Sequence, residues 1–214
     1  MCFSATSSFI MAGSLFFTTV LALHKAQHKK LIPLCLMPLG FAIQQAAEGV
    51  VWLTITTPNN MLHRVSIYTF LSFAFIIWPL WIPFAIKVYE SHETKKMLLS
   101  LCQLLGLLFA LTAAFFLFAA KPLVVVEGGN LAYYFPHNFF AGKSSLAWYL
   151  IPTVLPFLLI GSRIIGTALG SFALVSLAVT YFVTPAGLIS VWCYLAAVMS
   201  LMILGLVWQE SNRG

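Results

Sequence analysis

The sequence contains no aspartate. Its acidic residues are five glutamates, namely Glu48, Glu90, Glu93, Glu127 and Glu210. This absence excludes an intramembrane protease that depends on paired aspartates, and it disfavours sites in which carboxylate oxygens hold Mg²⁺ and a diphosphate. The phosphate-binding loop, the zinc-protease motif and the serine-hydrolase elbow are missing as well.

Charged side chains of either sign are scarce. Only 7% of the 214 residues are charged, whereas 61% are hydrophobic, and the mean hydropathy is +0.98. A soluble domain carries roughly 25% charged residues. We therefore expect lipid to be the solvent for most of the chain. The net charge of +6 lies in short clusters between apolar segments, a pattern typical of membrane topology signals, and predicts no nucleic-acid binding.

Cysteine is also rare, and its spacing indicates no metal or redox site. The four cysteines are Cys2, Cys35, Cys102 and Cys193. The last three lie in apolar runs, where a thiol usually behaves as a small buried hydrophobe. The sequence therefore predicts no metal site and no disulfide framework, and no motif identifies a cofactor.

Long apolar segments are what the chain does have. A membrane-spanning helix needs about 20 mostly apolar residues. Seven segments qualify, and they predict an all-α, polytopic transmembrane helix bundle in a single domain, 1–214, with one long loop at 120–144. Segments six and seven are joined so tightly that a re-entrant hairpin is an alternative for them. The predicted spans are 6–23, 32–55, 65–88, 97–119, 145–162, 165–184 and 187–208.

Basic residues predict the orientation. With seven spans, the odd-numbered links and the C-terminus carry Lys25, Lys29, Lys30, Lys87, Lys95, Lys96, Arg163 and Arg213. The opposite side carries only Arg64, Lys121 and Lys143. Because cytoplasmic loops are enriched in Lys and Arg, we expect the N-terminus outside and the C-terminus in the cytoplasm, in a bacterial-type inner membrane crossed several times.

Prolines occur in pairs inside three of the predicted spans. The pairs are Pro33 with Pro38, Pro79 with Pro83, and Pro152 with Pro156. Each proline removes a backbone donor, so these spans are expected to bend or unwind. Kinks of this kind open gaps within a bundle, although proline is also simply commoner in membrane helices.

Glu48 is the only ionisable side chain well inside a predicted span. A carboxylate in hydrocarbon costs several kcal/mol, so Glu48 should face the bundle interior and be paired or protonated. Gln44 and Trp52 lie four residues before and after it and share its helical face with Phe41, while Gln45 points to a neighbouring face. Glu48 therefore either binds a proton, cation or polar ligand, or has a structural role in hydrogen bonds between helices.

Further candidates lie on the predicted outer side. The N-terminal strip with Ser4 and Ser8 enters the membrane near the end of the second span and is expected to meet the cluster around Glu48. Cys2 is either a reactive thiol or an inert buried one, and Arg64 is the nearest basic partner for Glu48. The candidate ligand-binding residues are Glu48, Gln44, Gln45, Cys2, Ser4, Ser8, Trp52, His63, Arg64 and His137.

An aromatic segment at 133–140 follows in the long loop. It is richer in aromatic residues than a solvated link requires. We expect it either to lie on the membrane surface or to plug the mouth of the bundle.

Two sequence blocks resemble a known family. The opening MCFSA with Ser8-Phe9, and the IQQxxEGxxW block from Ile43 to Trp52, are similar to those of an uncharacterised family of small bacterial multi-pass membrane proteins. The segment from Val191 to Ala197 resembles the C-terminal block of that family. The resemblance covers the chain and implies a helix bundle, but it supplies no catalytic residues.

Three interpretations of function remain open. The first is a binding or transport protein with a polar intramembrane pocket centred on Glu48. The second is a membrane enzyme that acts on a lipid-like substrate, with Glu48 as acid or base and Cys2 assisting. The third is an accessory subunit of a larger membrane complex. The partners they imply are the lipid bilayer, a small polar ligand, proton or lipid, and a homo-oligomer or complex.

Overall fold

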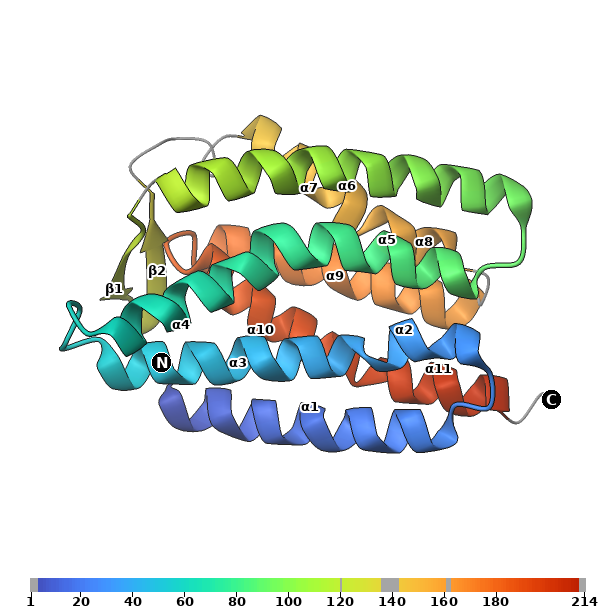
Figure 1. Ribbon diagram of the computed structural model, residues 1–214, viewed down its shortest axis with the longest axis horizontal. Helices are drawn as coiled ribbons and strands as arrows, with labels where there is room; N and C mark the ends of the chain where they lie inside the picture. Colours follow the sequence, from blue (N-terminus) through green and yellow to red (C-terminus); the bar gives the residue numbers. More distant parts are fainter. Residues whose placement is uncertain (1–3, 120, 136–142, 161–162, 212–214) are drawn as a thin grey trace.

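The computed structural model describes residues 4–119, 121–135, 143–160 and 163–211, which are mostly helical. Long helices lie side by side along the long axis of the molecule, and the two chain termini mark opposite ends of it (Figure 1). The first half contains α1 (Ala5–Lys25), η1 (Lys29–Leu31), α2 (Ile32–Cys35), α3 (Met37–Thr54), α4 (Met61–Ser72), the π-helix η2 (Phe73–Ile77), α5 (Trp78–Tyr89) and α6 (Glu93–Ala119). The second half contains β1 (Leu123–Glu127), β2 (Asn130–Tyr134), α7 (Lys143–Thr153), α8 (Leu155–Leu159), α9 (Arg163–Val183), α10 (Leu188–Ser200) and α11 (Met202–Ser211).

Six helical stretches of the described chain are long and apolar enough to cross a membrane. They are Ala5–Lys25, Lys29–Thr54, Met61–Tyr89, Glu93–Ala119, Gly166–Val183 and Leu188–Ser211. They coincide with six of the seven predicted segments, including the sixth and seventh. The remaining segment, the fifth, has only a shorter apolar helix, Ser145–Leu159. The chain is thus a multi-pass membrane protein by the length and composition of its helices.

The three proline pairs coincide with irregularities in the helices. Pro38 stands in the first turn of α3 and Pro156 in the first turn of α8, just after breaks at Leu36 and Val154. Pro79 and Pro83 both lie in α5, directly after the π-helix. Proline lacks the N–H that a helix interior requires, and the predicted bends follow from this.

One of these prolines also permits a close helix contact. Because Pro83 has no N–H, the carbonyl of Pro79 lacks its usual helical donor. Gly106 of α6 packs directly on this carbonyl, since a Cβ built at Gly106 would lie 2.1 Å from the Pro79 oxygen. Only glycine permits this approach, which holds α5 and α6 together.

The predicted loop at 120–144 contains a β-hairpin, and for residues 123–134 the prediction of a loop is wrong. Strands β1 and β2 pair antiparallel, with Glu127 opposite Asn130. Gly128 and Gly129 form the two-residue turn with φ of +56° and +78°, values that glycine adopts without strain. Only these two strands depart from the all-α expectation within the described residues. We call the end of the bundle that carries this hairpin the hairpin end (Figure 1).

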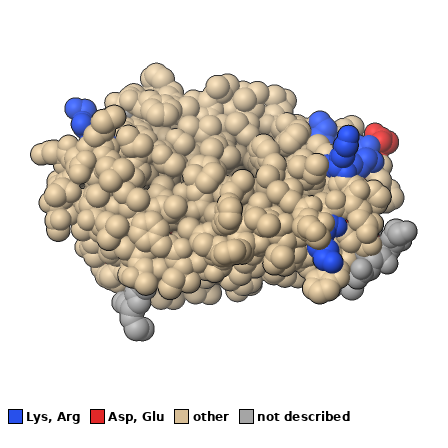
Figure 2. All heavy atoms as spheres, turned by 60° about the horizontal axis from the view of Figure 1, so that its bottom comes forward, with Lys and Arg blue, Asp and Glu red and all other residues tan. Residues whose placement is uncertain are grey.

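The opposite end of the bundle is basic. Figure 2 shows Lys and Arg side chains gathered there, with an acidic side chain among them. We call this the lysine end, and it includes Lys25, Lys29, Lys30, Lys87, Lys95 and Lys96 from the links between α1 and α2 and between α5 and α6. The two ends therefore differ in charge as the sequence predicts.

Candidate functional site

Glu48 lies in the bundle interior, in the half of α3 nearer the hairpin end, and only 1% of it is exposed. Its Oε1 accepts a hydrogen bond of 2.5 Å from the Ser190 hydroxyl of α10, and its Oε2 accepts one of 3.3 Å from Gln45 Nε2. Neither donor carries a charge. No ion pair of the described residues involves Glu48. The carboxyl group is therefore buried between helices, and its hydrogen-bond partners among the described residues are all neutral.

Small residues bring the surrounding helices close to Glu48. Helix α3 packs along α1, and at Gly49 the ring of Phe9 lies so near that a Cβ would stand 2.9 Å from it. On α10, Ser190, Cys193 and Ala197 are all buried and recur at helical spacing, and α10 contacts α3. The hydroxyl of Ser190 reaches Glu48 across this contact.

Gln44 does not bond Glu48, although their four-residue spacing places both on one helical face. Its Nε2 donates to the Phe70 carbonyl at 3.3 Å, and its Oε1 accepts from Trp78 Nε1 at 2.7 Å. The Cys193 thiol lies within hydrogen-bonding reach of the same amide. These contacts turn Gln44 towards α4 and α5. Gln45 takes its place beside Glu48, because residues three apart are also neighbours on a helix.

Several buried polar atoms near the hairpin end form no hydrogen bond with the described protein. Most buried polar atoms in proteins have a partner, so such a group is unusual. The amide of Gln45 is the most informative, since Oε1 is free although Nε2 binds Glu48. The others at this end are Ser8 Oγ, Trp52 Nε1, Asn130 Oδ1 and Tyr133 Oη.

Tyr133 approaches the site from β2. Its ring stacks on Phe70 with centroids 5.0 Å apart and planes 7° from parallel. Burial, and then the nearby carboxyl of Glu48 and thiol of Cys193, raise the pKa of Tyr133 well above its ordinary value. Tyr133 thus lies inside the bundle and not on its surface, and the hairpin covers the Glu48 region from the hairpin end.

Ser190 and the placement of Tyr133 were not found by sequence reasoning. Ser190 directly precedes the block that begins at Val191, and a buried serine in so apolar a helix is the only local signal. Tyr133 belongs to the aromatic segment, but nothing local identifies it as the member that enters the bundle. The Gly128-Gly129 pair between two apolar runs is a hairpin signal that predicts where β2 begins.

The other candidate residues have different surroundings. Ser4 caps α1 in a reciprocal bond with Ser7 and is exposed, whereas Ser8 is buried beside α3. His63 is buried and shares a hydrogen bond of 2.8 Å with Thr54, which joins α3 to α4. Trp52 is half-buried.

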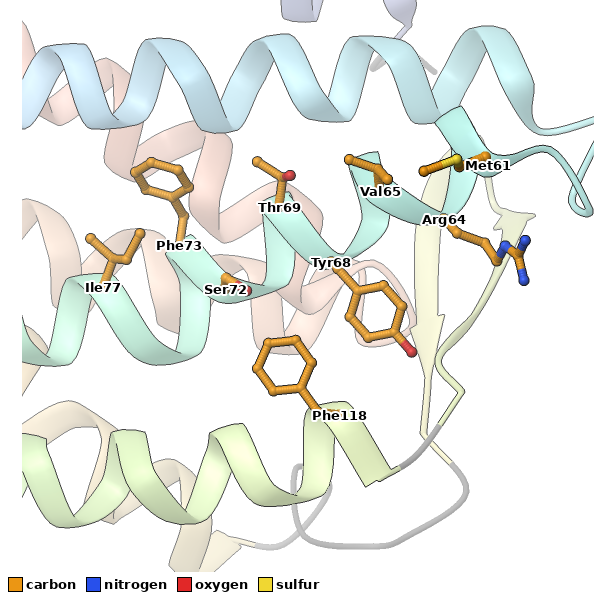
Figure 3. A pocket seen from close by; sticks show the side chains of 9 residues that line it. All are labelled: Met61, Arg64, Val65, Tyr68, Thr69, Ser72, Phe73, Ile77 and Phe118. Atoms are coloured by element: carbon orange, nitrogen blue, oxygen red, sulfur yellow. The ribbon is translucent and has the colours of Figure 1, made fainter.

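Arg64 is not the partner of Glu48, and this expectation is wrong. It is exposed in the first turn of α4 and joins no ion pair of the described chain. Glu48 is buried in the bundle, whereas the side chain of Arg64 extends towards the hairpin (Figure 3). Cys2 and His137 lie outside the described residues.

The described residues contain no group of three or more His, Cys, Asp or Glu side chains that is placed to hold a metal ion. The chemistry available at the Glu48 site is therefore that of one carboxyl, its neutral donors and an amide oxygen. Such a set favours a proton or a small ligand that donates hydrogen bonds.

Comparison with known proteins leads to one family. The chain belongs to a family of unknown function (DUF6629), whose model matches residues 1–214. This agrees with the resemblance to an uncharacterised family that covers the whole chain. No curated protein and no solved structure matches the sequence.

Proposed function

Because membership of this family assigns no activity, we propose a function from the site itself: the protein binds a small cation, in the simplest case a proton, at Glu48 and carries it through a bacterial inner membrane. The observation that supports this most is a fully buried carboxyl group whose two hydrogen-bond donors, Ser190 and Gln45, are both neutral. We place the hairpin end outside and the lysine end in the cytoplasm, following the distribution of Lys and Arg.

The burial of Glu48 supports a bound cation. An ionised carboxylate in a low-dielectric interior loses on the order of several kcal/mol of hydration free energy. Two neutral hydrogen bonds offset only part of that loss. A proton or another cation on the carboxyl removes the unbalanced charge. Glu48 is thus expected to hold a proton or cation in the closed bundle and to release it when water reaches the site.

Gln45 is suited to both states of the carboxyl. When Glu48 is ionised, Gln45 Nε2 donates to it, as in the structure. When Glu48 is protonated, a half-turn of the amide would present Gln45 Oε1, which otherwise has no partner, as an acceptor for the carboxyl proton. Ser190 can likewise donate or accept. The site therefore satisfies the carboxyl in either state without moving a helix.

The surroundings of Glu48 favour access from the hairpin end. On the side towards the lysine end, Phe41 and Trp78 stack with centroids 3.9 Å apart, and both Nε2 and Oε1 of Gln44 have hydrogen-bond partners. On the other side lie the polar atoms of Trp52 and Tyr133 that have no partner in the described chain. A cation that enters from outside would thus meet polar groups before it meets the aromatic contact.

Proton flux into liposomes tests this proposal. The purified protein would be reconstituted with an internal pH-sensitive dye, and a pH gradient imposed. We expect Glu48→Gln to lower the flux per folded protein by about tenfold or more, because an amide cannot exchange a proton. Glu90→Gln is the matched control, since Glu90 is equally buried but lies at the lysine end, and it should leave the flux unchanged.

The same assay separates transport from a purely structural role. If Glu48 only joins α3 to α10, the Glu48→Gln variant should behave as the wild type in flux, and that result would overturn the proposal. Addition of sodium or methylammonium in place of the pH gradient identifies the cation. A flux that depends on Glu48 with one of these ions, and not with protons, would assign that ion as the cargo.

A further inference from the structure

An open groove runs along one side of α4 and continues over the π-helix η2. Its volume is about 720 Å³, and it is lined by side chains that include Arg64, Val65, Tyr68, Phe73, Ile77 and Phe118 (Figure 3). All but Phe118 come from α4 and η2, and Phe118 reaches in from the end of α6. The rings of Tyr68 and Phe118 stack with centroids 5.8 Å apart and planes 10° from parallel, so they form a defined wall.

We infer that this groove binds a glycerophospholipid of the outer leaflet, with the phosphate on Arg64 and an acyl chain along the groove towards Ile77. The inference is independent of the Glu48 site, and its choice of the outer leaflet rests on the proposed orientation. It rests on the position of the only cation among the groove residues, on the length of the groove and on its apolar walls.

Arg64 supplies the charge complementarity. It is exposed at the end of the groove nearest the hairpin, and it extends away from the apolar side chains (Figure 3). No carboxylate of the described chain pairs with it. A guanidinium group presents a planar fork of donors that matches the oxygens of a phosphate. The head-group region of the outer leaflet is where such a phosphate lies.

The length of the groove fits one leaflet. From Arg64 to Ile77 the helix advances by about 20 Å, at roughly 1.5 Å per residue. One leaflet of hydrocarbon is about 15 Å thick, and the phosphate lies just beyond it. A lipid whose phosphate meets Arg64 therefore places its acyl chain beside Val65, Phe73 and Ile77.

Within the part of the chain that the structure describes, the groove is open on its outer side. Two of the side chains that line it at the start of α4, Met61 and Val65, are 73% and 49% exposed. A second copy of the chain offers little counter-charge for Arg64, since Glu127 is the acidic residue of the hairpin end and already accepts a 2.5 Å bond from Tyr134. A phospholipid supplies both the charge and the apolar chain.

Native mass spectrometry of the purified protein tests the inference with two lipids that share their acyl chains. Phosphatidylglycerol carries the phosphate, whereas diacylglycerol does not. We expect wild-type protein to bind phosphatidylglycerol about tenfold more tightly, and Arg64→Gln to remove most of this difference. Arg64→Lys should retain part of it, because lysine keeps the charge without the fork.

A second pair of variants tests the groove itself. Thr69→Trp fills the groove and should weaken the binding of both lipids. Ser14→Trp, on the exposed face of α1, is the matched control and should bind as the wild type. Equal binding of phosphatidylglycerol by wild type and Arg64→Gln would overturn the inference. Equal behaviour of the two tryptophan variants, or dimers that Thr69→Trp dissociates, would overturn it as well.

Discussion

Glu48 and Glu90 are both buried carboxyl groups, yet they lie in opposite halves of the bundle and in different surroundings. Glu90, which follows α5 at the lysine end, accepts bonds from the backbone N–H groups of Ser91 and His92 at 2.8 and 3.0 Å. Its other oxygen lies 3.8 Å from Lys95 Nζ. Among the described residues, the hydrogen-bond partners of Glu48 are only the neutral side chains of Ser190 and Gln45.

This difference shows that two equally buried carboxyl groups can have different kinds of partner. Glu90 is bonded by two backbone donors and lies near a lysine, and these contacts join the end of α5 to α6. Neutral donors of the kind around Glu48 tolerate both the ionised and the protonated form. On the proposed function, the type of partner, and not the depth, separates Glu90 from a carboxyl group that exchanges a proton.

Removal of the Gln44 amide, which bonds both Phe70 and Trp78, should produce the largest loss of stability. Gln44→Leu leaves the buried Trp78 N–H without its acceptor, which costs about 2 kcal/mol of unfolding free energy. Gln45→Leu removes only the 3.3 Å bond to Glu48 and should cost about 1 kcal/mol or less. Unfolding by SDS in mixed micelles measures both. Equal losses would contradict the distinction between Gln44, whose Nε2 and Oε1 both have hydrogen-bond partners, and Gln45, whose Oε1 has none in the described chain.

The two glutamates should respond differently to the same substitution. Glu90→Gln weakens two charge-assisted bonds and should lower the unfolding free energy by about 1 kcal/mol. Glu48→Gln replaces a carboxyl group in neutral surroundings by an amide of the same shape and should change stability by less than about 0.5 kcal/mol. A larger loss for Glu48→Gln than for Glu90→Gln would show that the ionised form of Glu48 stabilises the fold.

The lysine near Glu90 should contribute least. Lys95→Met removes a partner that is one-third exposed and 3.8 Å away, so the expected loss is below about 0.5 kcal/mol and shrinks further in salt. Lys96→Met, which breaks the exposed pair with Glu93, is the comparison and should have a similarly small effect. A loss near that of Glu90→Gln would mean that the lysine, and not the backbone N–H groups, holds Glu90.

Parts of the candidate site follow from the sequence and parts do not. That Glu48 faces the interior could be predicted, because a carboxyl group in contact with acyl chains is too costly. The sequence could not predict which amide bonds Glu48, since Gln44 and Gln45 both lie within one helical turn of it. The choice was decided by Trp78, whose N–H holds Gln44 from 34 positions away.

The sequence by itself determined the membrane bundle, six of its seven predicted spans and the basic end, because hydropathy, proline and charge act over a single turn or span. Only the tertiary structure decided that Ser190, 142 positions away, bonds Glu48, that Tyr133 enters the bundle, and that Arg64 turns away from the site. These contacts depend on how each helix is rotated against its neighbours. That rotation is set by the packing of residues far apart in the chain, such as Gly106 on Pro79.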